Sequence, residues 1–396
     1  MRVRAERRRF LVAGAAWLAA PAVHAASRTL AGVAPTGAGT EPTGAQSDAG
    51  PLYLAARKHD DSFEAVVLDA RGQIARTVAL EARGHSFAID APRQRAVVFG
   101  RQAGFFATAF DLQGRQAAAA LPLPPDRHYF GHGVYREDGH LLFATENDFE
   151  AGRGVLGVYD ASPGGAYRRV GEFDSDGIGP HEVLLMPDGR TLCVANGGIL
   201  THPDYGKLEL NLDTMVPSLV YLDLASGTVV DRVALPAHLH RLSIRHLAIA
   251  ADGAVWFGMQ YSGPTADRPP LVGRHRRGQS AAELFAGPPE VLRRLRNYVG
   301  SVSVDAAGNI VATSSPVGGL VVYWDAASGA CLGTTTIADG CGVAPAGDGR
   351  FVLSSGEGVV QQSGPDLPTT EFDRDPSTAW DNHFRRVDSK KAYIAG

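Results

Sequence analysis

Short apolar runs separated by turn residues follow one another from Leu52 to the end of the chain. In one recurring pattern, an apolar run ends in Asp and a Gly follows three or four residues later, as in Asp69–Gly72, Asp111–Gly114, Asp160–Gly164, Asp223–Gly227 and Asp325–Gly329. Asp caps the backbone of its own turn and Gly accepts a positive φ. Each of these segments therefore predicts a hairpin turn.

A second pattern, an apolar strand that runs into Asp-Gly or a close relative, alternates with the first. It occurs at Asp138-Gly139, Asp188-Gly189, Asp252-Gly253, Ala307-Gly308 and Asp348-Gly349. Together the two patterns define a four-stranded unit whose first strand begins near His85, His132, His181, His246, Gly300, Cys341 and His383. The intervals of 41 to 65 residues between these starts fit the blades of a propeller.

Seven starts predict an all-β fold, a seven-bladed β-propeller over residues 51–396. The strands before His85 lack a first strand of their own, whereas the segment after Trp380 supplies one with few successors. The N- and C-terminal strands are therefore expected to share one blade and close the ring. Two separate β-sandwiches are the alternative architecture. One short helix is expected, from about Pro289 to Asn297.

Composition agrees with many short strands, since 47 of the 396 residues are Gly and 24 are Pro. The formal net charge of −4 provides no basic surface for nucleic acid. Three cysteines, Cys193, Cys331 and Cys341, are too few and too scattered for a disulfide scaffold and are expected to be buried.

Residues 1–25 have the features of a twin-arginine signal peptide. Arg7-Arg8-Arg9-Phe10-Leu11 matches the R-R-x-F-L pattern, and an apolar run to Ala20 follows that is too short to span a membrane. With cleavage expected after Ala25, the mature protein would be periplasmic, would have no membrane span, and would carry a charge near −8, because five Arg and one Glu are removed. Residues 26–50, rich in Ala, Gly, Thr and Pro, predict a flexible linker.

Histidine occupies five of the seven predicted blade starts, and the symmetry of a propeller would bring these side chains together around one axis. Imidazole is a frequent ligand of iron, zinc and copper. The candidate metal ligands are therefore His85, His132, His181, His246 and His383. The alternative is a structural role, as in WD-repeat propellers, where a His hydrogen-bonds a turn Asp. The short spacing of six residues from His132 to Asp138 instead places the ring at the mouth of the channel.

Two further segments are expected to contribute polar groups to the same face. The first is the long insertion from Asn196 to about Pro217, because long loops in compact domains are usually functional. The second carries two guanidinium groups that could bind carboxylate or phosphate. The candidate ligand-binding residues are Asn196, His202, Asp204, Arg241 and Arg245.

Two other acidic positions are expected to be structural. Strand alternation places Glu182 on the opposite face from His181, packed between blades or in solvent. Residues 146–148 are expected to form a turn. No recognised catalytic signature is present, including G-x-S-x-G, H-E-x-x-H, the phosphate-binding Gly loop and C-x-x-C-H. No catalytic residue is assigned for this reason.

Four phrases resemble the bacterial exported family called domain of unknown function 1513. They are GIGPHEV at residues 177–183, VANGGI with THPD at 194–204, LELNLDTM at 208–215, and LSIRHLA at 242–248. The resemblance implies a YVTN/WD-like seven-bladed propeller with a twin-arginine signal. It also implies a periplasmic role in iron uptake beside imelysin-like or dihaem proteins.

The sequence thus predicts a periplasmic propeller, expected to be monomeric, that binds a metal ion or a small metal complex at the channel mouth. Iron is favoured by the resemblance, and copper and zinc suit the same ligands. A binding role is favoured over catalysis. The alternatives are a metal-dependent, lactonase-like hydrolase and a non-catalytic scaffold for protein interaction. Hydrolases of that kind generally use several carboxylate ligands, whereas these blade starts provide imidazoles.

Overall fold

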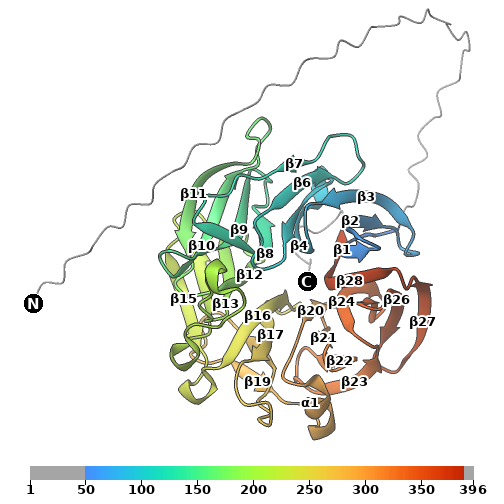
Figure 1. The fold of residues 1–396 in the computed structure, drawn as a ribbon. Coiled ribbons are helices and arrows are strands. Elements are labelled where there is room, and N and C mark those ends of the chain that lie inside the picture. Colours follow the sequence, from blue (N-terminus) through green and yellow to red (C-terminus); the bar gives the residue numbers. More distant parts are fainter. Residues whose placement is uncertain (1–49, 388–396) are drawn as a thin grey trace, which may run out of the picture. The chain divides into compact units, whose positions relative to one another are not determined.

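A computed structural model of the protein describes residues 50–387. Seven antiparallel sheets of four strands each surround a central axis (Figure 1). This arrangement confirms the predicted all-β, seven-bladed propeller. The predicted signal peptide of residues 1–25 and all but the last residue of the predicted linker, 26–50, lie outside the described residues.

In each sheet, the four strands are ordered from the central axis to the outer rim. The innermost strands are β4 (Gly84–Asp90), β8 (Arg127–Tyr135), β12 (Pro180–Leu185), β16 (Leu242–Ile249), β20 (Ser301–Val304), β24 (Gly340–Gly347) and β28 (Thr378–Val387). The second strands are β5 (Arg95–Gly100), β9 (Leu141–Asp148), β13 (Thr191–Asn196), β17 (Val255–Tyr261), β21 (Ile310–Ser315), β25 (Arg350–Ser355) and β1 (Leu52–His59). The third strands are β6 (Ala107–Asp111), β10 (Arg153–Asp160), β14 (Ser218–Asp223), β18 (Val272–His275), β22 (Leu320–Asp325), β26 (Val359–Gly364) and β2 (Ser62–Leu68). The outermost strands are β7 (Ala119–Ala120), β11 (Arg168–Asp174), β15 (Val229–Ala234), β19 (Glu283–Phe285), β23 (Cys331–Thr336), β27 (Leu367–Arg374) and β3 (Ile74–Leu80).

The two ends of the described chain share one blade, as predicted. Strand β28 pairs antiparallel with β1, with Tyr53 opposite Arg386 and Ala55 opposite Phe384. Each innermost strand contacts the next, and β28 contacts β4, so the ring is closed. Closure by hydrogen bonds between distant segments holds the innermost strands at fixed positions around the axis.

The turns follow the predicted chemistry. At the turn between β2 and β3, Asp69 accepts hydrogen bonds from the backbone N–H groups of Arg71 and Gln73, and Gly72 has a φ of +78°. The predicted helix is present as α1 (Pro289–Leu295), and short 3-10 turns occur at Ala91–Arg93, Pro203–Tyr205, Leu212–Thr214 and Ala237–Leu239. Among the described residues, no helix is long and apolar enough to cross a membrane.

Apolar side chains fill the space between neighbouring blades. The largest cluster includes Tyr221 of β14, Trp256 of β17 and Trp324 of β22, and each of these rings is fully buried. Burial of one large apolar side chain contributes roughly 1.5–3 kcal/mol, so the contacts between blades provide a rigid wall for the channel. Cys193 and Cys341 are buried and Cys331 is half-buried, and none of these three forms a disulfide.

Candidate metal centre

Five histidine rings from five innermost strands meet at the centre of the propeller. We call His85, His132, His181, His246 and His383 the five-histidine cluster. Their exposed fractions lie between 1% and 6%. Nine pairs of these rings have centroids 4.6–6.4 Å apart. The structure therefore brings all five predicted metal ligands together.

A β-bulge accompanies every histidine of the cluster. The register between first and second strands shifts at Gly84/Phe87, Tyr129/Gly133, Pro180/Glu182, Ile244/His246 and, opposite residues 381–383 of β28, Ala55/Arg57. A bulge leaves one or more residues outside the ladder and changes the direction of their side chains. Consecutive side chains can then turn toward the axis, where a regular strand would alternate between its two faces.

Gly131 makes room for one ring of the cluster. A Cβ at this position would lie 2.5 Å from Cδ2 of His85, and the φ of Gly131 is +102°. A residue with a side chain would meet both the steric contact and the backbone strain. The Gly-His pair at residues 131–132 therefore serves two blades, because the glycine accommodates His85 and the next residue is a member of the cluster.

In four of the five histidines, the two ring nitrogens, Nδ1 and Nε2, have different surroundings. The Nδ1 atoms of His85 and His383 lie 2.8 Å from Asp381 Oδ1 and 3.4 Å from Ser301 Oγ. Those of His132 and His246 lie 3.5 and 3.6 Å from the two carboxylate oxygens of Glu182, and the second distance is too long for a hydrogen bond. The Nε2 atoms of the same four rings are buried and have no hydrogen-bond partner among the described residues. A metal-binding histidine characteristically holds one nitrogen against a carboxylate and presents the other to the ion.

The cluster could hold a metal ion. One ring nitrogen each from His85, His132 and His181 lies within 4.8 Å of the others, and the same holds for His132, His246 and His383. Three nitrogens that each lie about 2.1 Å from one ion are about 3.4–3.6 Å apart, so ring shifts on the order of 1 Å would complete either set. Both sets use His132, which favours one ion at a time.

The rings are uncharged at neutral pH. Burial lowers the pKa of His132 to about 3 and that of His246 to about 4. Burial likewise places the pKa of His181 and that of His383 well below the usual value, and lowers that of His85. A neutral imidazole retains the lone pair that a metal requires, so no proton has to be displaced at neutral pH.

Glu182 lies inside the channel, and the expectation that it faces away from His181 is wrong. The shift at Pro180/Glu182 interrupts the alternation of β12, so the carboxylate reaches His132 and His246. The buried Arg385 donates at 2.5 Å to Oε1 of this carboxylate, the oxygen that also lies nearest His132. Burial would raise the pKa of Glu182, but the Arg385 charge holds this pKa well below its ordinary value.

Asp381 is the second carboxylate that sequence reasoning missed. It contacts His85, and it pairs with Arg83 at 2.5 Å and with Arg101 at 3.2 Å. Burial would raise the pKa of Asp381, but the hydrogen bond from His85 and the two guanidinium charges lower it. The D-N-H order of residues 381–383 is the available signal, yet only the bulge in β28 turns Asp381 toward a ring on another blade.

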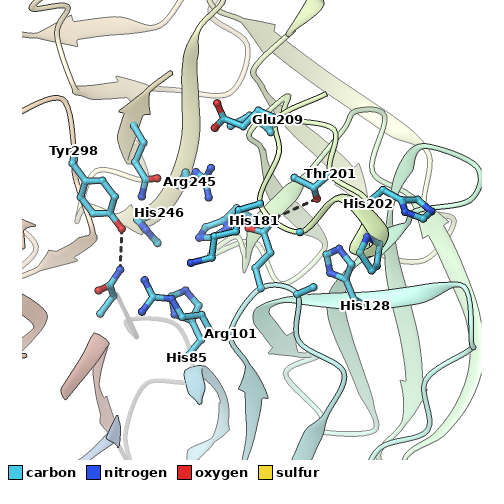
Figure 2. Close-up of a pocket in the computed structure, with 18 residues that line it drawn as sticks. His85, Arg101, His128, His181, Thr201, His202, Glu209, Arg245, His246 and Tyr298 are labelled. Carbon is cyan, nitrogen blue, oxygen red and sulfur yellow. Dashed lines mark hydrogen bonds between the residues drawn. The ribbon is translucent and has the colours of Figure 1, made fainter. Parts of the chain in front are cut away.

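A cavity of about 390 Å³ borders the cluster (Figure 2). His85, His181 and His246 form part of its wall, while His132 and His383 lie outside its lining. The other lining residues are Arg101, Gln102, Ala103, His128, Ile199, Thr201, His202, Pro203, Gly206, Lys207, Glu209, Arg245, Gln260, Tyr298 and Asn382. The long insertion after β13 thus forms one side of the cavity. This volume is in the range of small-molecule sites.

The predicted ligand-binding residues separate into two groups. His202 and Arg245 line the cavity. Asn196 is fully buried, and its Nδ2 donates to the Ser175 carbonyl at 2.8 Å. Within the described part of the chain, Asp204 and Arg241 do not line the cavity.

The two outlying residues have other surroundings. The Asp204 side chain is 83% exposed, and its backbone N–H donates to His202 Nδ1. Arg241 pairs with the exposed Asp213 at 2.5 Å. Sequence reasoning did not single out Arg101, Tyr298 and Asn382, because they come from loops and strands that lie far apart in the chain.

A family model described as "Protein of unknown function (DUF1513)" matches residues 78–387. The chain belongs to this family. The match runs from within β3 to the end of β28, so it includes the whole five-histidine cluster and the cavity beside it. No curated protein matches the sequence.

Solved propellers have the same fold as this DUF1513 protein. Hydrazine synthase of Kuenenia stuttgartiensis is 15% identical with a TM-score of 0.57, over 85% of this chain and 99% of that chain. The β-propeller domain of Cps50 (Swd1) from Myceliophteria thermophila is 11% identical with a TM-score of 0.54, over 87% and 97% of the two chains. At these identities the similarity concerns the fold alone.

Proposed function

We propose that this DUF1513 protein binds one transition-metal ion at the five-histidine cluster and acts as an accessory protein in iron acquisition. One observation supports the proposed metal binding. Four buried Nε2 atoms, which have no hydrogen-bond partner within residues 50–387, lie in one cluster, while the Nδ1 atoms of the same rings face Asp381, Glu182 and Ser301. Leaving a buried nitrogen unpaired costs roughly 1–3 kcal/mol, and a bound metal would remove that cost at each ligand.

The donor set supports a borderline metal. Neutral imidazoles suit Fe(II), Cu(II) and Zn(II), whereas Mg²⁺ and Ca²⁺ prefer oxygen ligands. The two carboxylates near the rings contact the Nδ1 atoms and the guanidinium groups, which is an outer-shell position. Iron is the ion that we propose for the cell, with copper and zinc as the competing occupants.

The cellular part of the proposal concerns place and partners. A twin-arginine signal over residues 1–25 would export the folded protein to the periplasm. Imelysin-like or dihaem proteins of iron uptake would be its partners there. The formal net charge of the chain, −4 before cleavage, gives no support for a nucleic-acid partner.

Elemental analysis of the protein, exported and purified without a histidine tag, tests the site. We expect close to one equivalent of iron, copper or zinc per chain in the wild type. The double variant His181→Ala/His246→Ala should lose this metal, because both rings line the cavity and belong to different triads. Anaerobic reloading with Fe(II), Cu(II) and Zn(II) in turn would rank the occupants.

The matched control removes two histidines outside the cluster. His140 and His238 are exposed, so His140→Ala/His238→Ala should keep the wild-type metal content. Equal metal content in both double variants would contradict the site. Trace metal in the wild type that no reloading increases would favour a scaffold function instead.

A further inference from the structure

The charges around the five-histidine cluster do not neutralise a bound cation. A divalent ion on neutral imidazoles keeps both of its positive charges. Glu182 is already paired with Arg385. Asp381 is shared between Arg83 and Arg101, which leaves that trio with one excess positive charge. A buried charge that lacks a counter-charge is costly, so a metal-loaded cluster would attract an anion.

The cavity beside the cluster supplies two guanidinium groups for such an anion. Arg101 approaches His85, and Arg245 approaches His181 and His246 (Figure 2). Burial lowers the pKa of Arg245, Tyr298 and the charge of Glu209 raise it, and the nearby charge of Arg101 lowers it. Arg245 donates through Nε to Ser243 Oγ, and among the described residues no carboxylate lies within 4.0 Å of its guanidinium.

The remaining walls offer neutral donors and little negative charge. The Tyr298 hydroxyl, which accepts from Asn382 Nδ2 at 3.4 Å, and the amide of Gln260 line the cavity near the rings. Lys207 adds a third cation at the exposed side. Glu209 is the acidic lining residue; its carboxylate accepts a hydrogen bond from Ser262, and its charge also acts on Arg245.

We propose that the cavity binds a small organic anion with two or more carboxylate groups, so that the protein takes up its metal together with this ligand. One carboxylate lies between Arg101 and Arg245, since a planar guanidinium binds a carboxylate through two parallel hydrogen bonds. A second carboxylate reaches the ion through the side of the cluster formed by His85, His181 and His246. This inference rests on the proposed function, because the ion provides part of the attraction.

A titration of the full-length protein loaded with Co(II) tests the inference. The visible absorption of Co(II) responds to a change in its ligands, so added malonate should produce a saturable spectral change. Arg101→Gln and Arg245→Gln should each raise the Kd for malonate by about tenfold or more, as expected for a lost charge-assisted hydrogen bond. Titrations are compared at equal Co(II) occupancy, which is measured for every variant.

Three comparisons make the result decisive. Arg241→Gln is the matched control, because Arg241 pairs with Asp213 and neither residue lines the cavity, and its malonate Kd should equal that of the wild type. Malonamide, which is uncharged, should not bind. Phosphate should bind more weakly than malonate. Phosphate binding as tight as malonate binding, or an equal loss in the Arg241→Gln variant, would overturn the carboxylate assignment.

Failure of this inference can be separated from failure of the metal site. If Co(II) binds and malonate leaves its spectrum and the heat of titration unchanged, the metal site stands and the anion site is wrong. If Co(II) does not bind, calorimetry with malonate on the metal-free protein still tests the arginine pair. Heat that is lost in both Arg101→Gln and Arg245→Gln would support the anion site, and no heat in the wild type would overturn it.

Discussion

Two buried glutamates in neighbouring blades have opposite electrostatic surroundings. Glu146 of β9 and Glu182 of β12 are exposed by 0% and 2%, and each contacts one arginine. Glu146 shares Arg169 with Glu172, whereas the Glu182 carboxylate has Arg385 as its arginine partner. Burial raises the pKa of Glu146 despite Arg169, while Arg385 holds the pKa of Glu182 well below its ordinary value.

The difference separates a structural network from a ligand site. Glu146 is enclosed by the Tyr159 hydroxyl at 2.6 Å and by Arg169 at 2.8 Å, and Gly157 leaves the space that its carboxylate fills. Its oxygens thus have protein partners on both sides. Both oxygens of Glu182 also have protein donors, Arg385 and the backbone N–H of Leu247, but the neighbouring rings of His132 and His246 keep Nε2 atoms that have no hydrogen-bond partner among the described residues. A buried group that lacks a protein partner indicates a missing ligand more strongly than burial itself does.

Glu182→Gln should have the largest effect, because it leaves the buried Arg385 without its counter-charge. We expect the free energy of unfolding of the metal-free protein to fall by about 3–5 kcal/mol, measured by urea denaturation. The double variant Glu182→Gln/Arg385→Met removes both charges and should recover part of this loss. A single variant as stable as the wild type would show that the ion pair is unimportant.

Glu146→Gln should have a smaller effect, since the amide can still accept from Tyr159 and Arg169 remains paired with Glu172. The expected loss in the free energy of unfolding is about 1–3 kcal/mol. Metal content should not change, which elemental analysis of the same sample measures. Loss of metal in this variant would contradict the assignment of Glu146 to a structural network and of Glu182 to the ligand site.

Asp381→Asn should lower the affinity for the metal. The Asp381 carboxylate holds Nδ1 of His85 at 2.8 Å and thereby presents Nε2 to the cluster. Loss of such an outer-shell partner typically lowers metal affinity by about 10–100-fold. Competition with a chelator gives the affinity. Asp148→Asn is the control. Asp148 is linked to Glu146 through the ion pairs of Arg127, Glu172 and Arg169, and this variant should leave the metal affinity unchanged.

Glu172→Gln should have the smallest effect, and the effect should depend on pH. Burial opposes the shift, but hydrogen bonds from Arg169, Arg153 and Arg127 lower the pKa of Glu172 from 4.5 to about 2. The stability that Glu172 contributes is thus complete above pH 4.5 and is lost as the pH falls toward 2. We expect the free energy of unfolding at pH 6 to be about 1 kcal/mol higher for the wild type than for the variant. The difference is small because solvent screens the charge interactions of this partly exposed side chain.

Denaturation curves at pH 6, 4 and 3 measure this difference. The two proteins should approach each other in stability as the pH falls, since a protonated Glu172 and a Gln are alike in charge. A difference that stays constant over these pH values would show that another group is responsible.

The sequence predicted the fold and the members of the cluster, but not their surroundings. Repeated turn residues locate the blades, and the five histidines recur at blade starts, so the symmetry of the propeller was sufficient to bring them together. Glu182 was expected on the opposite face because a regular strand alternates. Residues 146–148 were expected to form a turn, yet β9 runs through them as a buried strand. The first error arises from the register shift in β12, and the second from pairing of residues 146–148 with β8 and β10; a local pattern contains neither.

The amino-acid sequence by itself determined that the chain folds as a seven-bladed propeller, because turn chemistry and apolar runs act over a few residues and repeat. The tertiary structure decided which ring nitrogens are contacted, which carboxylates face them and where a small molecule can reach them. Those features depend on bulges in separate innermost strands and on contacts such as His85 with Asp381, 296 residues away. Local sequence cannot specify them, since closure of the ring brings these atoms together.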